Sequence, residues 1–267
     1  MLSLDAPTVA LVWQAGFARL ARTPAGWPEA CVLGASTWLA YAADRWFEGW
    51  RLAPDQIRTQ RHHFYQRWRW AILAVWLVLF AADLLIALTR LTSREIAAGL
   101  ILLGPVLLYL LSHQLLHRDR LWRVPKEVCV ALLIAGGAAV FPCAATRVAW
   151  PQWIVPLALF ALVCFANCAL ISAWEHEVDA VHGQRSLARQ HGRHHPLIRA
   201  LPWALVLLAL ACAALGGIEA RPTAAAVGTS AALLGLIDLA EAGLGWQLAH
   251  ALADAALLTP LLFGPWR

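Results

Sequence analysis

One stretch of sequence indicates the fold most directly: Glu175-His176-Glu177-Val178-Asp179-Ala180-Val181-His182-Gly183, which follows a long apolar run over residues 151–173. Carboxylates at positions i and i+4 of a helix lie on the same face, so Glu175 and Asp179 can direct oxygen atoms to one point. Carboxylates beside hydrocarbon are costly in free energy and usually mark a function. The stretch therefore predicts a polar site at the end of a membrane-spanning helix.

A similar motif lies nearer the N-terminus, in Tyr41-Ala42-Ala43-Asp44-Arg45-Trp46-Phe47-Glu48. Asp44 and Glu48 have the same i, i+4 spacing and lie at the end of an apolar run over residues 28–45. We call this the first acidic motif and Glu175 to Gly183 the second acidic motif. Together they predict two pairs of carboxylates on two helices.

Composition places both motifs in an integral membrane protein. Hydrophobic residues make up 61% of the chain and charged residues 14%, against roughly 25% charged residues in soluble domains. A spanning helix needs roughly 20 mostly apolar residues. We predict an all-α fold, one domain over residues 1–267, with about nine transmembrane helices in a bundle around a central cavity. The candidate helices cover residues 6–22, 28–45, 70–89, 96–116, 125–145, 151–173, 197–217, 223–241 and 246–264.

The basic residues predict the orientation of this bundle. Fourteen of the 21 arginines and lysines fall in or beside the loops that follow predicted helices two, four and six. The positive-inside rule places those loops in the cytoplasm, and with them the N-terminus and both acidic motifs. No cleavable signal peptide is recognisable, because Met1 to Trp13 contains Asp5 and neither lysine nor arginine. We expect a protein of a bacterial-type inner (plasma) membrane. Its net charge of +5 is expected to interact with anionic lipid headgroups and not with nucleic acid.

The acidic motifs and the surrounding arginines favour one chemistry. Magnesium prefers oxygen ligands and usually takes one or two carboxylates together with substrate phosphates. Arginine binds phosphate oxygens in a bidentate manner. A magnesium-bound diphosphate beside an apolar bundle is therefore predicted, and the bundle could house an isoprenoid tail.

At these residues the sequence resembles the UbiA superfamily of membrane prenyltransferases. That family has Asn-Asp-x-x-Asp-x-x-x-Asp at the end of helix two and Asp-x-x-x-Asp-x-x-x-Gly at the end of helix six. Asp44 and Glu48 match the last two acids of the first pattern, and Glu175, Asp179 and Gly183 match the second at full spacing. The resemblance implies that the four acids bind Mg²⁺ and act in catalysis.

Basic residues extend the resemblance. Arg45 stands where an arginine is frequent in the family, Arg58-Thr59 and Arg61 resemble its Arg-Thr…Arg segment, and Arg185-Ser186 resembles its Lys-Ser continuation. Lys126 resembles a lysine that opens helix five. The resemblance implies that these basic residues bind the diphosphate of a prenyl diphosphate and that the isoprenoid passes to an unidentified hydrophobic acceptor, aromatic or lipid-like.

The chain departs from the family pattern at the start of the first acidic motif. Ala40-Tyr41 replaces the leading Asn-Asp, and Glu48 and Glu175 stand where aspartate is usual. Tyr41 and the mid-helix Asn167 are expected to line the cavity. Because one acid is lost, a second function remains open, that of a catalytically degenerate protein that binds a lipid without turnover. A terpene-cyclising relative would use the same ionisation without an acceptor.

Two other classes also remain open. Histidine clusters at His113/His117, at His191/His194/His195 and at His62-His63 are similar to the boxes of di-iron membrane hydroxylases and desaturases. A transporter or proton relay could use four residues near the C-terminus. These are Asp238, Glu241, His250 and Asp254.

Overall fold

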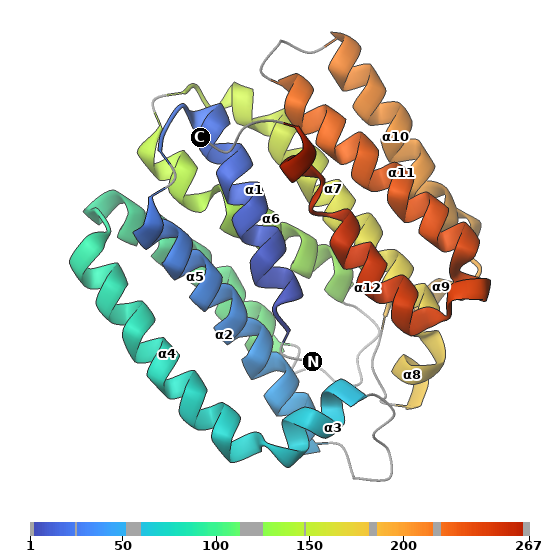
Figure 1. The fold of residues 1–267 in the computed structure, drawn as a ribbon, viewed down its shortest axis with the longest axis horizontal. Coiled ribbons are helices and arrows are strands. Elements are labelled where there is room, and N and C mark those ends of the chain that lie inside the picture. The colour runs from blue at the N-terminus through green and yellow to red at the C-terminus, as the bar shows by residue number, and fades with distance from the viewer. Residues whose placement is uncertain are drawn as a thin grey trace.

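The structure is a computed structural model of the chain. It describes residues 3–24, 26–51, 60–112, 125–146, 148–181, 186–215 and 220–263; side chains of residues 48–51 and 60–62 lie outside the described part. Within these ranges every regular element is a helix (Figure 1). The predicted all-α class is confirmed.

The long helices follow the apolar runs of the sequence, and three short helices lie between them. In chain order they are α1 (Asp5–Ala21), α2 (Trp27–Arg51), α3 (Gln60–Arg67), α4 (Arg69–Arg90), α5 (Ser93–Leu111), α6 (Lys126–Ala145), α7 (Pro151–Trp174), α8 (His176–Val181), α9 (Leu187–His191), α10 (Pro196–Leu215), α11 (Arg221–Leu244) and α12 (Trp246–Ala256), followed by the 3-10 helix η4 (Thr259–Leu262).

Six helices of the described part are long and apolar enough to cross a membrane: α4, α5, α6, α7, α10 and α11. Each predicted span overlaps a helix, although α12 covers only part of the span over residues 246–264, and α1, α2 and α12 are not in this set of six. Two of these three are short, α1 with 17 residues and α12 with 11. The third, α2, is long but carries charged side chains, among them Glu29, Asp44 and Arg45.

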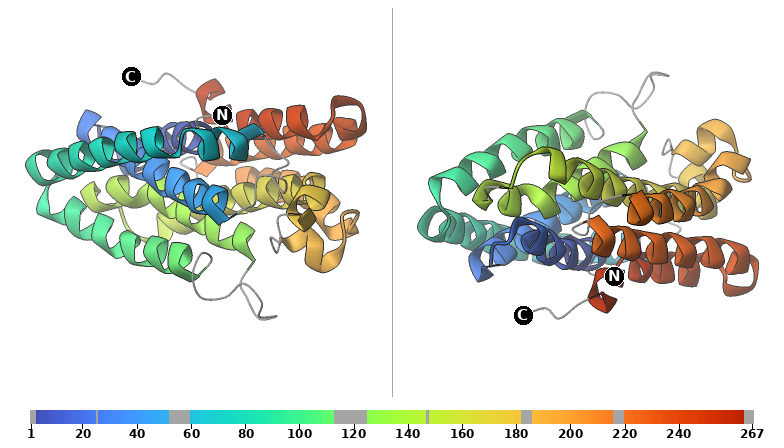
Figure 2. Two further views of the ribbon diagram at one scale, coloured as in Figure 1. Left: turned by 90° about the horizontal axis from the view of Figure 1, so that it is seen from below. Right: turned by 90° about the horizontal axis from the view of Figure 1, so that it is seen from above.

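The helices are arranged in two layers when the molecule is seen edge-on (Figure 2). The chain packs α1 against α2 and α6, α2 against α4, and α5 against α6. In the other half, α7 packs against α6, α10 and α11, and α12 packs against α11 and α7. Helices α6 and α7 therefore join the half formed by α1 to α5 to the half formed by α10 to α12.

An aromatic cluster fixes α1 against α7. The rings of Trp13 and Phe160 are stacked with centroids 4.1 Å apart, and Phe17 contacts Phe160 and Trp153. The indole N–H of Trp13 donates to the carbonyl of Leu257 at 2.8 Å, so this buried polar group is satisfied. The cluster ties α1 to the residue that follows α12 and thereby positions the start of α1.

Helix α7 ends at the second acidic motif rather than running through it. Glu175 is the C-cap residue, with φ −89° and ψ 11°, and α8 begins at His176. The amide of Asp179 nevertheless donates to the carbonyl of Glu175 at 2.8 Å, which keeps the helical i to i+4 spacing across the break.

At the other end of the chain, Gly245 adopts a φ of +78° between α11 and α12, a conformation that a side chain would strain.

Candidate active site

A cavity of about 1080 Å³ lies among α2, α4, α5, α6, α7 and α12. Ligand pockets usually measure roughly 300–1,000 Å³, so this one has room for a long ligand. Most of its wall is apolar and comes from α2, α4, α5 and α6. Polar residues gather at the ends of α2 and α7, some from the two acidic motifs and others from neighbouring helices. They are Tyr41, Asp44, Arg45, Lys126, Asn167, Glu175, Asp179, Gln190, His191, His250 and Asp254.

From the first acidic motif, α2 brings Tyr41, Asp44 and Arg45 to the cavity. Their spacing of three and four residues puts them on neighbouring positions of one helix face. The guanidinium of Arg45 lies 5.9 Å from the centroid of the Tyr41 ring. Glu48 is in the same helix, but its side chain is outside the described part.

From the second acidic motif, Asp179 is the most deeply buried acid. Its side chain is 6% exposed, and its Oδ1 lies 3.7 Å from the ammonium nitrogen of Lys126. Lys126 is in the first turn of α6 and is half-buried. The other oxygen, Oδ2, is buried and has no hydrogen-bond partner among the described residues. Asp179 therefore offers an acceptor to a ligand or cation in the cavity.

Glu175 takes part in a chain of polar contacts that ends on α12. Its Oε1 lies 2.8 Å from Nδ1 of His250, and Nε2 of His250 lies 3.5 Å from Oδ2 of Asp254. The amide of Asn167 donates to Oδ1 of Asp254 at 3.2 Å. The chain Glu175–His250–Asp254–Asn167 thus links α7 to α12.

The same contact controls the charge of Glu175. Burial alone would raise the pKa of this carboxyl, because desolvation disfavours the charged form. The hydrogen bond and charge of His250 outweigh burial, with help from Arg45 and Lys126, and hold the pKa below its usual value. Glu175 is therefore a carboxylate over the neutral pH range.

Some predicted residues fall where the structure gives no side chains. Arg58 and Arg185 lie outside the described residues, as do His113 and His117. Arg61 and His62 belong to α3, but their side chains are not described. The structure thus brings together Asp44, Arg45, Lys126, Glu175, Asp179, Tyr41 and Asn167 from the predicted set.

His250 and Asp254 line the cavity end, and Asp5 places a donor atom within 4.8 Å of theirs; the sequence did not assign these three residues to this site. His250 and Asp254 lie at i and i+4 of α12, so one face of a largely apolar helix carries two ionisable groups, and this signal could have been used. Asp5 gave no comparable signal, because an acid in the first turn of a helix is common near the positive end of the helix dipole.

The four residues of the transporter hypothesis separate into two groups. The indole N–H of Trp174 donates to Asp238 at 3.0 Å, and Arg199 lies 3.9 Å from the same carboxylate. Glu241 pairs with Arg193 at 3.5 Å. Both acids therefore connect α11 to neighbouring segments, while His250 and Asp254 line the cavity.

The apolar part of the cavity also contains polar groups. Ser36 donates to Oδ2 of Asp83 at 2.7 Å, while Oδ1 of Asp83 is buried without a partner among the described residues. Glu95 closes a capping box with Thr92 at the start of α5. Trp76 donates to the carbonyl of Leu39 at 2.9 Å, and its ring stacks on Phe80 at 5.3 Å.

Comparison with known proteins connects this architecture to one fold. No family model matches the sequence, and no curated protein matches it either. Among solved structures, the chain is similar to the apo structure of a UbiA homolog from Aeropyrum pernix K1, with a TM-score of 0.61 and 18% sequence identity over 98% of each chain. The protein has the UbiA fold, and the resemblance seen in the acidic motifs is confirmed at the level of the fold.

Proposed function

We propose, from this shared fold, that the protein is an intramembrane prenyltransferase that ionises a prenyl diphosphate and transfers the isoprenoid to a hydrophobic acceptor. One observation carries the proposal: both acidic motifs and Lys126 meet at one end of a cavity of about 1080 Å³ whose remaining wall is mostly apolar. A prenyl diphosphate matches this cavity, because its charged diphosphate fits the polar end and its hydrocarbon tail fits the apolar part.

The donor set fits Mg²⁺. Asp44, Glu175 and Asp179 line the cavity end, and a buried Oδ2 of Asp179 is available. With Glu48 they supply the carboxylate oxygens that Mg²⁺ prefers. When bound, Mg²⁺ would offset the negative charge that develops on the departing diphosphate.

The protein's own residues supply binding and shielding. Arg45, Arg58, Arg61, Lys126 and Arg185 are proposed to hold the diphosphate oxygens, which favours breaking the C–O bond with its electron pair leaving on the diphosphate. Tyr41 and Asn167 border the reacting carbon. The acceptor then forms the new bond to that carbon and releases a proton.

The apolar wall would hold the prenyl chain and exclude water. Trp76 and Phe80 present stacked rings to the cavity. Aromatic faces attract cations, so this pair could stabilise the positive charge of an isoprenoid cation that lies against it. Exclusion of water would protect the isoprenoid cation from hydrolysis.

The membrane arrangement completes the proposal. We infer that α1, α2 and α12 cross the membrane together with the six candidate spans. The N-terminus and the cavity's charged end then face the cytoplasm of a bacterial-type inner membrane. The basic loops beside the acidic motifs support this orientation.

The test is diphosphate release by purified protein in lipid nanodiscs, with Mg²⁺ and labelled prenyl diphosphates of several lengths. The double variant Asp44→Asn, Asp179→Asn is expected to lower the rate ~100-fold or more, because it removes charge from the proposed metal and diphosphate site. Removing Mg²⁺ with a chelator should stop the reaction.

Glu177→Gln is the matched control. This acid is in α8 with Asp179 but is 86% exposed and contacts Arg193, so the rate should stay near that of the wild type. Equal rates for the wild type and the double variant would contradict the catalytic proposal.

A lipid-binding protein without turnover is the second candidate. Tyr41 stands where the family has an acid, and Glu175 already has His250 as a partner. This function would be supported if labelled prenyl diphosphate binds the wild type, binds the Asp44→Asn, Asp179→Asn variant more weakly, and releases no diphosphate from either.

A further inference from the structure

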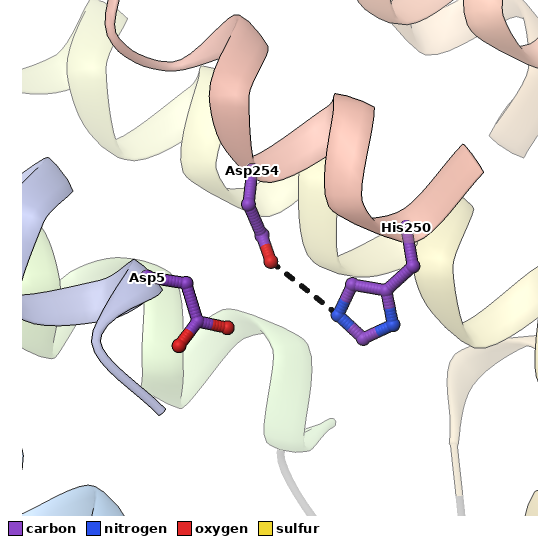
Figure 3. A group of neighbouring side chains, drawn as sticks. All are labelled: Asp5, His250 and Asp254. Atoms are coloured by element: carbon purple, nitrogen blue, oxygen red, sulfur yellow. Dashed lines mark ion pairs between the residues drawn. The ribbon is translucent and has the colours of Figure 1, made fainter. Parts of the chain in front are cut away.

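A second group of metal donors lies beside the proposed magnesium site. Asp5, His250 and Asp254 each place one donor atom within 4.8 Å of the others (Figure 3). They come from the first turn of α1 and from one face of α12, two helices that pack together. Unlike the four acids of the proposed magnesium site, this group includes a nitrogen donor.

Glu175 fixes the ring of His250 for this arrangement. Its Oε1 lies 2.8 Å from Nδ1, so a proton on Nδ1 is held by the carboxylate. When His250 is neutral with its proton on Nδ1, the other nitrogen, Nε2, has a lone pair for a metal ion, and this nitrogen lies 3.5 Å from Oδ2 of Asp254. Metal-binding histidines usually have a carboxylate or carbonyl on the outer nitrogen in this way.

Asp254 is oriented from its outer side as well. The amide of Asn167 donates to Oδ1 at 3.2 Å, which leaves Oδ2 directed toward His250. Asn167 is 5% exposed, and its own Oδ1 is buried without a partner among the described residues. A buried amide oxygen without a partner is an independent sign that this end of the cavity receives a donor or a cation.

The spacing of the inner donors fits coordination. A tetrahedral ion with metal–ligand distances of about 2.1 Å separates neighbouring ligand atoms by about 3.4 Å, close to the 3.5 Å between Nε2 of His250 and Oδ2 of Asp254. Two carboxyl groups directed at the same space, Asp5 and Asp254, can both be ionised at low cost only if a cation lies between them; otherwise they share a proton.

We propose that Asp5, His250 and Asp254 bind a divalent transition-metal ion, such as Zn²⁺ or Mn²⁺, at a site distinct from the proposed magnesium site. Imidazole favours such ions over Mg²⁺, and the two carboxylates complete a mixed nitrogen and oxygen set. Glu175 orients His250 from outside the site. The proposal does not depend on the identity of the substrate.

The experiment uses metal-free full-length protein, titrated with Mn²⁺ and measured by pulsed electron paramagnetic resonance. A nitrogen ligand produces ¹⁴N modulation of the Mn²⁺ echo, which a site made only of carboxylates does not. The wild type is expected to show this modulation, and His250→Gln is expected to abolish it. Asp5→Asn and Asp254→Asn should weaken the binding at least ~10-fold, because each removes one charged ligand.

Asp44→Asn and Asp179→Asn are the matched controls. Each removes a carboxylate from the same cavity end but none from the proposed transition-metal site, so the ¹⁴N modulation should remain. Asp5→Asn is nearly isosteric and leaves the hydrogen bond between Glu175 and His250 intact, so its effect is measurable even if His250→Gln unfolds the protein.

Two results would overturn the proposal: no ¹⁴N modulation in the wild type at saturating Mn²⁺, or Mn²⁺ affinity unchanged in Asp5→Asn. The first would mean that His250 is a hydrogen-bond partner of Glu175 and not a metal ligand. Neither result bears on diphosphate release, so failure of this proposal and failure of the proposed prenyl transfer are distinguishable.

Discussion

Glu175 illustrates how much one contact changes the interpretation of a residue. From its spacing to Asp179 it is expected to be a metal ligand, equal in rank to Asp44. In the structure its Oε1 accepts from His250 at 2.8 Å, a contact between residues that are far apart in the sequence. Glu175 therefore both borders the proposed magnesium site and orients the histidine of α12.

Glu127 gives a prediction at the scale of a single hydrogen bond. It is 2% exposed, and its Oε1 accepts from the backbone amide of Leu187 at 2.9 Å. Glu127→Leu would leave that amide at the start of α9 without its partner, which costs about 1–3 kcal/mol. The expected result is a lower midpoint of thermal unfolding in detergent.

Glu127→Gln serves as the comparison, because a glutamine oxygen can still accept this hydrogen bond. Its midpoint should stay close to that of the wild type. If the leucine and glutamine variants unfold at the same temperature, the hydrogen bond to Leu187 does not stabilise the protein.

Among the helices, α10 and α11 form a close contact through a glycine. A Cβ atom at Gly235 would lie 2.7 Å from Cζ2 of Trp203. Gly235→Ala therefore forces the indole or the helices apart, with an expected loss of about 1–3 kcal/mol in stability. Thermal unfolding in detergent measures it.

Gly243, in the same helix α11, is the matched control. A Cβ atom there meets nothing within 4 Å, so Gly243→Ala should leave stability unchanged or raise it by up to ~1 kcal/mol through helix propensity. Similar destabilisation by both variants would show that the clash with Trp203 is not the cause.

The sequence predicted the existence of the long helices but not how they pack. The apolar runs predicted helices because a chain segment in lipid must satisfy its backbone polar groups within a helix; in the described part of the chain, six of the nine runs formed helices long and apolar enough to cross a membrane. The apolar runs do not predict that α7 packs against α12. Apolar side chains on one helix can pack against those of many other helices with similar energy. His250 was for this reason not assigned to the site, although its spacing to Asp254 was visible.

At the scale of the whole molecule, the cavity unites the two motifs that the sequence placed on separate helices. The prediction that both motifs share one end of the bundle followed from the distribution of basic residues. The contact of Lys126 with Asp179 and the chain Glu175–His250–Asp254–Asn167 could not be predicted, because they depend on side-chain positions in four elements, α6, α7, α8 and α12.

Orientation can be tested with single cysteines in a background without the native six. Cysteines replacing the exposed His63 in α3 and Glu177 in α8 should react with a membrane-impermeant maleimide from the cytoplasmic side. Those replacing Arg94 and Trp150, exposed at other helix ends, should react from the opposite side. We expect these two sides because the loops near the acidic motifs are rich in arginine, and such loops usually lie in the cytoplasm.

Inverted and right-side-out vesicles provide the two arms of this measurement. Labelling of His63→Cys and Arg94→Cys from the same side would contradict the proposed topology. Labelling of all four from the periplasmic side in right-side-out vesicles would contradict the cytoplasmic location of the site.

The two helices that form much of the cavity wall also face outward. In the most apolar stretch of α4 and of α5, only 6% of the residues are buried, against 50% in α7. Helix α4 packs on α2 and α5 packs on α6, while residues of all four line the cavity. A hydrophobic ligand inside is thus separated from the surrounding lipid by a wall one helix thick. Its supply is then governed by its mole fraction in the bilayer rather than by its concentration in water, so diluting the substrate with inert lipid should slow the protein at constant bulk concentration.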